Sequence, residues 1–250
     1  VETIPAVVEA KPDYMGLVFA PSKRQVTVDQ AKTLVEELHK QYGNRYSREE
    51  VQCSNDVVQD GAVIGAVQEG TATGDAHEGT LTSTENASPT LIHQEAIKTV
   101  GVFVNETLET LVKIATEVNL DAVQLHGDED EAFIQSLKER TNVEVWKAVQ
   151  IRSAADAEAW IDSSADMLLF DAYHKDERGG TGEVFDWSCL DEFERPFMLA
   201  GGIDSTNVAR AIRTVRPYGI DISSGIETDG VKDDEKIKAF TNIVRTIAMP

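Results

Sequence analysis

Three glycine-bearing loops are the features of this sequence that most directly indicate chemistry. Each loop follows an apolar run that predicts a buried strand. Glycine lets backbone amides approach an anion closely, and free amides at the start of a helix can hold a phosphate group. One such loop alone is typical of an ordinary turn, but three after successive strands favour a phosphate site. The residues concerned are Gly180, Gly182, Gly201, Gly202, Ser223, Ser224 and Gly225.

Asp171 ends the apolar run LLFD and is the candidate for proton transfer. A carboxyl group that is partly buried at the end of a strand has a raised pKa, which makes it usable as a general acid. The alternative is that Asp171 only caps the loop that follows. Its position beside the glycine loops favours the catalytic interpretation.

Arg24 and His126 also follow predicted strands. The guanidinium of Arg24 offers a planar fork for a carboxylate, although a solvated loop arginine fits the spacing equally well. For His126, the pattern favours a hydrogen-bonded histidine of the pocket over a proton carrier. The sequence shows no metal-binding spacing of His or Cys and no G-x-G-x-x-G after a strand, so neither a metal nor a dinucleotide cofactor is predicted.

Apolar, β-branched runs alternate with amphipathic stretches along most of the chain. This alternation is typical of βα units around a parallel sheet, and the unbroken apolar runs suit strands covered on both sides. Seven strands are predicted, at 14–20, 99–105, 122–127, 143–149, 167–173, 197–202 and 219–224. Helices are predicted at 1–9, 28–42, 108–118, 129–140 and 207–215. The predicted fold class is an α/β barrel.

One polar segment, 43–94, interrupts this alternation. A connection of this length is uncommon inside a compact domain. We interpret it as a surface insertion, partly disordered, in a single barrel domain that spans 1–250, with a functional lid as the alternative.

Composition limits the compartment and the partners. The 250 residues suit one α/β barrel, and the net charge of −21 disfavours nucleic acid as a partner. Two cysteines form no disulfide framework, which predicts a reducing compartment, the cytoplasm. No apolar run is long enough to predict a membrane span. The oligomeric state is not predicted.

Seven segments of the sequence resemble the phosphoribosylanthranilate isomerase family, TIM-barrel enzymes of tryptophan biosynthesis. They occur in the family's order and cover nearly all of the chain outside 43–94. The segments are GLVFAPSKRQV (16–26), VGVFVNE (100–106), DAVQLHGDE (121–129), LLFDA (168–172), GGTGEVFDW (179–187), LAGGI (199–203) and DISSGIETDGVKD (221–233).

The resemblance implies an isomerisation without a cofactor. In this family a general acid opens the ribose ring of N-(5-phosphoribosyl)anthranilate, and a general base then removes the C2 proton. Asp171 matches the acid, and Arg24 matches the residue that pairs with the anthranilate carboxylate. The glycine loops match the phosphate site, while His126 and Asp221 match positions that line the pocket.

The chain departs from the family at one important place. The family's general base is a cysteine in a K-x-C-G segment on the first strand, and this sequence has no such segment. Neither Cys53 nor Cys189 matches the family's cysteine, and the chain starts with the predicted first helix at 1–9. The expected fold is therefore a TIM (β/α)8-type barrel that lacks its first strand, and its seven strands leave two unpaired edges. One explanation, favoured by the absence of an initiator Met, is that the start of the gene product is missing. The other is a degenerate homologue that binds its ligand without turnover.

Two alternative functions remain open. The first is another phosphosugar barrel enzyme, such as indole-3-glycerol-phosphate synthase. That enzyme would need Lys and Glu at strand ends, and Lys147 is the one tempting candidate. The second is a non-catalytic barrel that binds a phosphorylated ligand.

Overall fold

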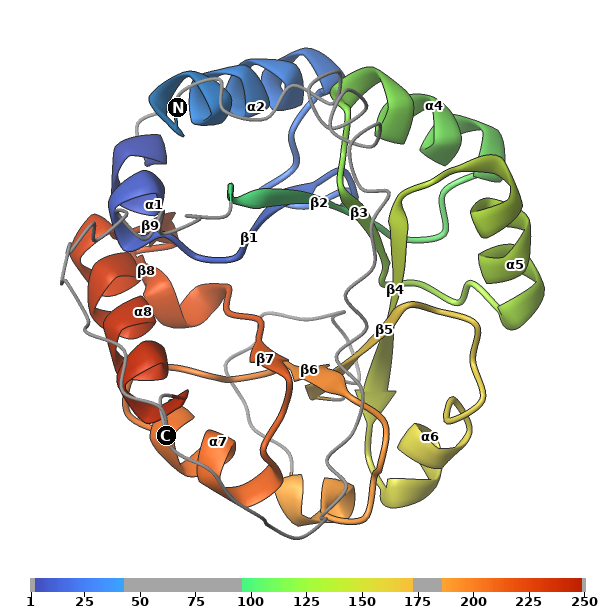
Figure 1. The fold of residues 1–250 in the computed structure, drawn as a ribbon, viewed down its shortest axis with the longest axis vertical. Coiled ribbons are helices and arrows are strands. Elements are labelled where there is room, and N and C mark those ends of the chain that lie inside the picture. The colour runs from blue at the N-terminus through green and yellow to red at the C-terminus, as the bar shows by residue number, and fades with distance from the viewer. Residues whose placement is uncertain (1–2, 43–95, 173–185, 249–250) are drawn as a thin grey trace, which may run out of the picture. The chain divides into compact units, whose positions relative to one another are not determined.

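The computed structural model of the chain describes residues 3–42, 96–172 and 186–248. These residues belong to a unit formed by 1–43 together with 96–250. Within this unit the strands lie at the centre and the helices surround them (Figure 1). The predicted insertion at 43–94 and the loop that carries Gly180 and Gly182 lie outside the described residues.

A single sheet of seven parallel strands forms the centre of the unit. Each strand pairs with its neighbours in sequence, in the order β1 to β7. Such parallel neighbours require crossover connections, which the helices supply. The strands are β1 (Tyr14–Val18), β2 (Lys98–Phe103), β3 (Ala122–Leu125), β4 (Glu144–Ile151), β5 (Met167–Ala172), β6 (Phe197–Leu199) and β7 (Gly219–Ile220). The prediction of a parallel α/β barrel with seven strands is confirmed.

Several strands end earlier than predicted. The segments predicted at 197–202 and 219–224 pair over only three and two residues respectively. Gly201 and Gly202 have positive φ angles of 81° and 64°, a conformation that belongs to turns and interrupts a strand. The glycines therefore lie in the loops beyond the strands.

The helices follow the predicted pattern with two omissions. They are α1 (Ile4–Ala10), α2 (Val28–Tyr42), α4 (Leu108–Val118), α5 (Glu131–Arg140), α6 (Ala154–Glu158), α7 (Val208–Val215) and α8 (Asp234–Ala248). Helix α5 begins two residues later than predicted because the side chain of Asp130 accepts a hydrogen bond from the amide of Phe133 and caps the helix. Helices α6 and α8 were not predicted.

Successive side chains of a strand point to opposite faces of the sheet, which divides the core into two layers. Val145 and Val149 of β4 belong to the large apolar cluster between the sheet and the helices. Trp146 and Ala148 belong to separate small clusters formed with neighbouring strands. The ring of Trp146 meets Tyr14 of β1 edge-on, with the ring centroids 4.7 Å apart. Side chains of one strand thus reach either the helix layer or the barrel interior.

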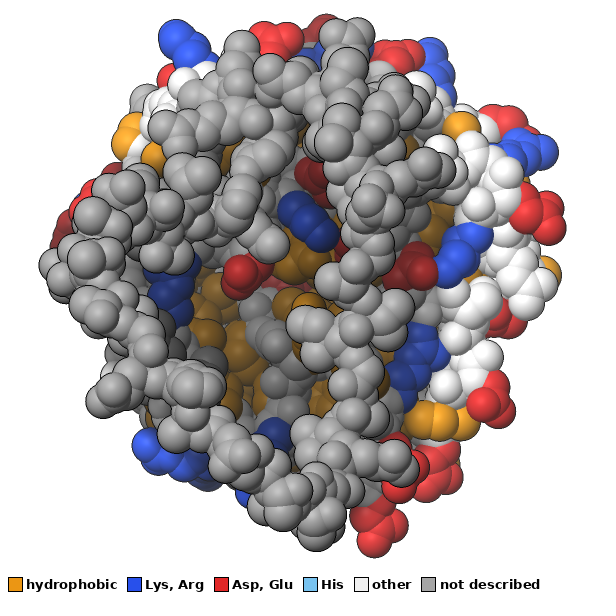
Figure 2. All heavy atoms as spheres, in the orientation of Figure 1, with side chains coloured by type: hydrophobic (Ala, Val, Ile, Leu, Met, Phe, Trp, Pro, Cys, Tyr) orange, Lys and Arg blue, Asp and Glu red, His pale blue; other side chains and the backbone are white. Residues whose placement is uncertain are grey.

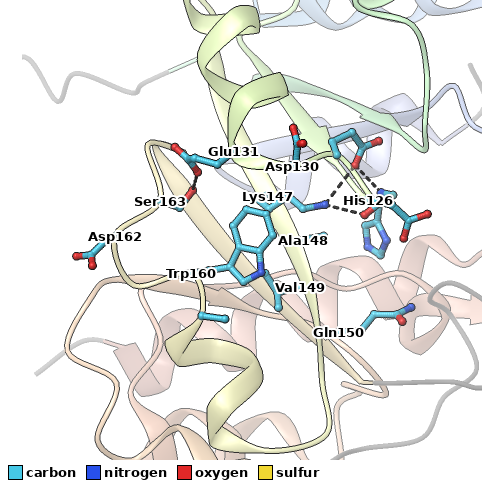
Figure 3. Close-up of a pocket in the computed structure, with 14 residues that line it drawn as sticks. His126, Asp130, Glu131, Lys147, Ala148, Val149, Gln150, Trp160, Asp162 and Ser163 are labelled. Atoms are coloured by element: carbon cyan, nitrogen blue, oxygen red, sulfur yellow. Dashed lines mark hydrogen bonds and ion pairs between the residues drawn. The ribbon is translucent and has the colours of Figure 1, made fainter.

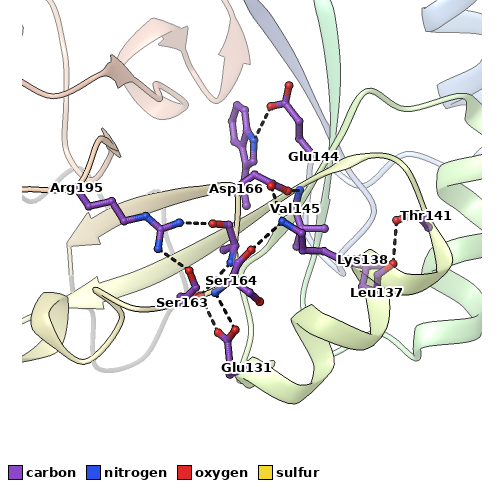
Figure 4. Close-up of polar contacts among 12 residues, drawn as sticks. Glu131, Leu137, Lys138, Thr141, Glu144, Val145, Ser163, Ser164, Asp166 and Arg195 are labelled. Atoms are coloured by element: carbon purple, nitrogen blue, oxygen red, sulfur yellow. Dashed lines mark hydrogen bonds and ion pairs between the residues drawn. The ribbon is translucent and has the colours of Figure 1, made fainter.

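Polar contacts fasten both ends of α5 to the chain that precedes β5 (Figure 4). At the start of α5, Glu131 accepts a hydrogen bond of 2.8 Å from the hydroxyl of Ser163. Near its end, Lys138 pairs with Asp166. The other oxygen of Asp166 accepts a hydrogen bond of 2.8 Å from the amide of Val145 in β4. Hydrogen bonds and an ion pair therefore connect α5, β4 and the segment before β5.

The opposite side of the barrel is open in its strand layer. No pairing joins β7 to β1 in the residues described, which fits the prediction of two unpaired edges. The helix layer nevertheless continues there, because Ala6 and Ala10 of α1 pack on Ile237 of α8 (Figure 1). An ion pair of 2.7 Å between Lys238 and Glu9 links the same two helices. None of the helices in the described ranges is long and apolar enough to cross a membrane.

Candidate active site

Asp171 lies near the carboxyl end of β5, and only 3% of its surface is exposed. Burial is the main reason that the pKa of its carboxyl rises to about 7, and the charge of nearby Asp221 adds to the shift. A hydrogen bond from the backbone of Ala172 opposes the shift in part. A pKa near neutrality suits a group that donates a proton and is then reprotonated.

His126 is the titratable group next to Asp171. Its Nε2 atom lies 3.5 Å from Oδ2 of Asp171, a distance at which the two groups form an ion pair when the imidazole is protonated. The amide of His126 donates a hydrogen bond of 2.8 Å to the carbonyl of Phe103, at the end of β2. The structure thus brings together two of the residues singled out from the sequence.

Gly201 packs directly against the acid. A Cβ atom at this position would lie 2.4 Å from the amide nitrogen of Ala172 and 2.8 Å from Oδ1 of Asp171. Together with the positive φ angle, this contact leaves room only for glycine. The loop after β6 is therefore adjacent to the carboxyl group, as the interpretation of the glycine loops requires.

The loops after β6 and β7 are also in contact with each other. A Cβ atom at Gly225 would lie 2.1 Å from the carbonyl oxygen of Ile203. Ser224 and Gly225 belong to a short 3₁₀ helix, η3 (Ser224–Ile226), which follows Ser223. Five of the seven loop residues singled out from the sequence are thus brought to one end of the barrel: Gly201, Gly202, Ser223, Ser224 and Gly225. Gly180 and Gly182 fall outside the part of the chain that the structure describes.

Asp221 follows β7 and faces the interior. Burial raises the pKa of its carboxyl, whereas the charge of Lys232 and a hydrogen bond from Gln124 act in the opposite direction. Its charge in turn raises the pKa of Asp171. His126, Asp171 and Asp221 therefore form one electrostatically linked group.

Arg24 is held by a glutamate that sequence reasoning did not single out. Its Nε atom donates a hydrogen bond of 2.8 Å to Glu227, which lies in β8 (Glu227–Thr228). Strand β8 forms a short hairpin with β9 (Val231–Lys232), and Lys232 approaches Glu227 to 3.2 Å. Burial opposes the ionisation of Glu227, but hydrogen bonds from Arg24 and Lys232 lower the pKa of its carboxyl. The SSG-x-E segment was the available signal for this residue.

The described part of the chain places no cysteine beside Asp171. Cys189 lies in the 3₁₀ helix η2 (Trp187–Leu190), against the apolar layer under the helices. Burial, together with the charge of Asp186, raises the pKa of its thiol and so disfavours the thiolate. Cys53 is outside the described residues.

Lys147, the candidate for an indole-3-glycerol-phosphate synthase lysine, faces the helix layer. Its Nζ atom lies 3.2 Å from Glu129 and 5.5 Å from the centre of the Trp160 ring. Asp171, in contrast, faces the barrel interior. Lys147 is therefore not placed to act with Asp171 on one substrate.

Among the side chains that are coloured in Figure 2, acidic and basic ones are interspersed around the visible face. Over 3–42, 96–172 and 186–248, no three His, Cys, Asp or Glu side chains are grouped so that they could hold a metal ion.

Fold and site together define a class: a parallel α/β barrel with a buried acid and glycine loops at the carboxyl ends of its strands. The family model of N-(5'-phosphoribosyl)anthranilate (PRA) isomerase matches residues 51–243. The chain belongs to this family.

Individual relatives agree with the family match. The chain is 38% identical over 241 residues to N-(5'-phosphoribosyl)anthranilate isomerase of Thermoanaerobacter sp. (strain X514), covering 96% of this chain and 90% of the relative. The crystal structure of phosphoribosyl anthranilate isomerase from Thermotoga maritima has a TM-score of 0.69 at 27% identity, with 98% of this chain and 94% of that chain covered. A further crystal structure, of phosphoribosyl anthranilate isomerase with reduced 1-(o-carboxyphenylamino)-1-deoxyribulose 5-phosphate, has a TM-score of 0.65 at 26% identity, covering 98% and 93%.

Proposed function

We propose that this protein isomerises N-(5-phosphoribosyl)anthranilate to 1-(2-carboxyphenylamino)-1-deoxyribulose 5-phosphate in tryptophan biosynthesis. The observation that carries the proposal is the buried carboxyl of Asp171, with a pKa of about 7, in contact with the Gly201 loop. Membership of the isomerase family supports the choice of substrate.

In the first step Asp171 acts as the general acid. Its proton passes to the ribose ring oxygen while the bond between that oxygen and C1 breaks, and the nitrogen lone pair forms the C1–N double bond. A base then removes the C2 proton, and the electrons of that bond generate the enol, which becomes the ketone. Atoms and electrons are conserved, so the reaction needs no cofactor. A pKa near neutrality lets Asp171 regain its proton between turnovers.

Substrate binding uses the two ends of the molecule. The phosphate binds at the loops after β6 and β7, where Gly201 and Gly225 bring backbone into close contact. The loop with Gly180 and Gly182 contributes as well. Arg24, held by Glu227, pairs with the anthranilate carboxylate, while His126 and Asp221 line the pocket between the two ends.

The second step needs a base that the described residues do not place beside Asp171. In the isomerase family this base is a cysteine of a K-x-C-G segment, and the sequence has no such segment.

Turnover assays test the proposal. We would assay the 250-residue chain and a version with a strand that bears the K-x-C-G segment added before Val1, using phosphoribosylanthranilate as substrate. The extended version should turn over, and Asp171→Asn should lower its kcat by about 100-fold or more while reduced product analogue still binds. A variant with near-normal kcat would refute the acid assignment. Analogue binding without turnover in either version would support the non-catalytic barrel instead.

We also infer a cytoplasmic location and a phosphorylated small molecule as the binding partner. A chain with two cysteines and no disulfide framework, from a biosynthetic enzyme family, supports the location. The net charge of −21 argues against nucleic acid. Fractionation of cells that express a tagged chain would test the location.

A further inference from the structure

A buried ion pair lies behind the active site, on the helix side of β4. Lys147 Nζ and Glu129 Oε2 are 3.2 Å apart, and only 3% of each side chain is exposed. Figure 3 shows the side chain of Lys147 beside the ring of Trp160, with His126 close by. The pair takes no part in the proposed proton transfers.

The hydrogen bonds of this pair end on the loop that carries His126. Glu129 accepts hydrogen bonds from the amides of Asn105 at 2.6 Å and Gly127 at 2.8 Å. Lys147 donates to the carbonyl oxygens of Gly127 at 2.7 Å and Leu125 at 3.4 Å. The residues immediately before and after the histidine are thus fixed by one buried charge pair.

The same loop has no room to adjust around Gly127. A Cβ atom there would lie 2.2 Å from Oδ1 of Asn105 and 2.7 Å from Oε1 of Glu129. The backbone must therefore stay close to both side chains. The conformation of the peptide that leads out of His126 is set by these contacts.

The space beside this loop is not filled by closely packed apolar side chains. A cavity of about 670 Å³ opens there, and His126, Gly127, Lys147 and Trp160 are among the residues that line it. Burying two charges is costly, and well-packed apolar side chains often stabilise a fold equally well. The presence of this charge pair is therefore poorly explained by a gain in folding stability. It is better explained by the specific loop conformation that its hydrogen bonds fix.

We propose that Lys147 and Glu129 are positioning residues that hold the imidazole of His126 against the carboxyl of Asp171. The inference rests on the proposed function of Asp171 as general acid. Lys147 faces the helix layer and His126 faces the interior, so the effect passes through the backbone of the loop. Asp171 is faced by His126 from the end of β3 and by Asp221 from the end of β7.

A titration cycle tests this proposal without substrate. The carboxyl of Asp171 is titrated by carbon NMR in the wild type, His126→Asn, Lys147→Met and the double variant. Because the imidazole lies 3.5 Å from the carboxyl of Asp171, replacing it by the Asn side chain should move the midpoint of Asp171 by about half a pH unit or more in the wild-type background. In the Lys147→Met background the same change should move the midpoint by less than half as much. Equal shifts in the two backgrounds would overturn the proposal.

Two further variants keep the test decisive. Lys98→Met is the matched control, because Lys98 pairs with Glu144 at 3.1 Å while 46% and 41% of the two side chains are exposed. In that background the shift caused by His126→Asn should be the full one. If Lys147→Met does not fold, Glu129→Gln provides the second background with nearly unchanged shape, judged by the same criterion.

The result of the Asp171 titration can be interpreted independently of the turnover assay. The titration is made on the free protein, so a coupling that depends on Lys147 supports the positioning role even if no substrate is converted. Equal shifts together with normal turnover would reject the positioning role and leave the proposed function intact.

Discussion

The two sides of the barrel hold their charged groups in different ways. On the β3 to β5 side, strands of four, eight and six residues pair continuously, and Lys147 and Glu129 are each 3% exposed. On the β7 and β1 side, β7 has two residues and the described strands do not meet. There the pair of Arg24 with Glu227 links the loops, and 26% of the arginine side chain is exposed.

This difference assigns different tasks to the two sides. In the proposed mechanism Asp171 is the proton donor, which requires a fixed geometry and desolvation, and the continuous sheet provides both. In the same proposal the substrate carboxylate must be able to reach Arg24, and the greater exposure of Arg24 at the open side permits this. Four substitutions would sharpen or break the comparison.

The largest effect is expected from Lys147→Met on the β3 to β5 side. Removing one partner leaves Glu129 as an uncompensated buried charge, which should lower the free energy of unfolding by about 3–5 kcal/mol. The exposed control, Lys98→Met, should cost about 1 kcal/mol or less. Urea unfolding of both variants measures the difference, and similar losses would show that the two pairs do not differ as described.

Asp171→Asn should stabilise the protein at alkaline pH. The folded pKa of about 7 lies above the ordinary value of 3.8, so stability from this group is complete below 3.8 and is lost as the pH rises through 7. The shift of about three units corresponds to at most about 4 kcal/mol. Thermal unfolding should therefore show a higher Tm for the variant at pH 8 and little difference near pH 4. An equal difference at both values would contradict the raised pKa.

Gly201→Ala should cost about 2–3 kcal/mol, because the new methyl group meets the amide of Ala172 and the backbone conformation is unfavourable. It should also displace the carboxyl of Asp171 and change its titration midpoint. Gly16→Ala is the control, since a Cβ atom at Gly16 would meet nothing within 4 Å. Equal losses in the two variants, measured by urea unfolding, would argue against close packing at Gly201.

The smallest effect is expected from Glu227→Gln on the open side. At pH 7 the loss should be about 1 kcal/mol, because the partners of Glu227 are partly exposed and solvent weakens the interaction. The lowered pKa of Glu227 means that its contribution is present above the ordinary value of 4.5 and is lost as the pH falls through the lowered value. Wild type and variant should thus converge in acid. A constant difference down to pH 2 would show that the charge of Glu227 is not responsible.

Most of the fold could be predicted from apolar periodicity. Seven apolar runs separated by amphipathic stretches correctly indicated the strands, and 28–42 and 108–118 match α2 and α4. Strand ends were less predictable, because pairing stops where neighbouring strands diverge, and that depends on tertiary structure. Helix α6 was missed since five residues carry too little periodicity to detect.

The site was predictable only where one strand determines a residue's environment. The burial of Asp171 follows from the apolar run that precedes it. The partners of Lys147 and Glu227 come from other strands and loops, so no local pattern identifies them. A lysine within the apolar segment VWKAV was a signal that a buried counterion had to exist, but it did not say which one.

Titration of the Asp171 carboxyl in the free wild-type protein tests the central claim most directly. Carbon NMR of the labelled side chain should give a midpoint near 7, the value that burial and Asp221 produce. A midpoint near the ordinary 3.8 would show that the carboxyl is solvated and ionised at neutral pH, and Asp171 would then not be the proton donor.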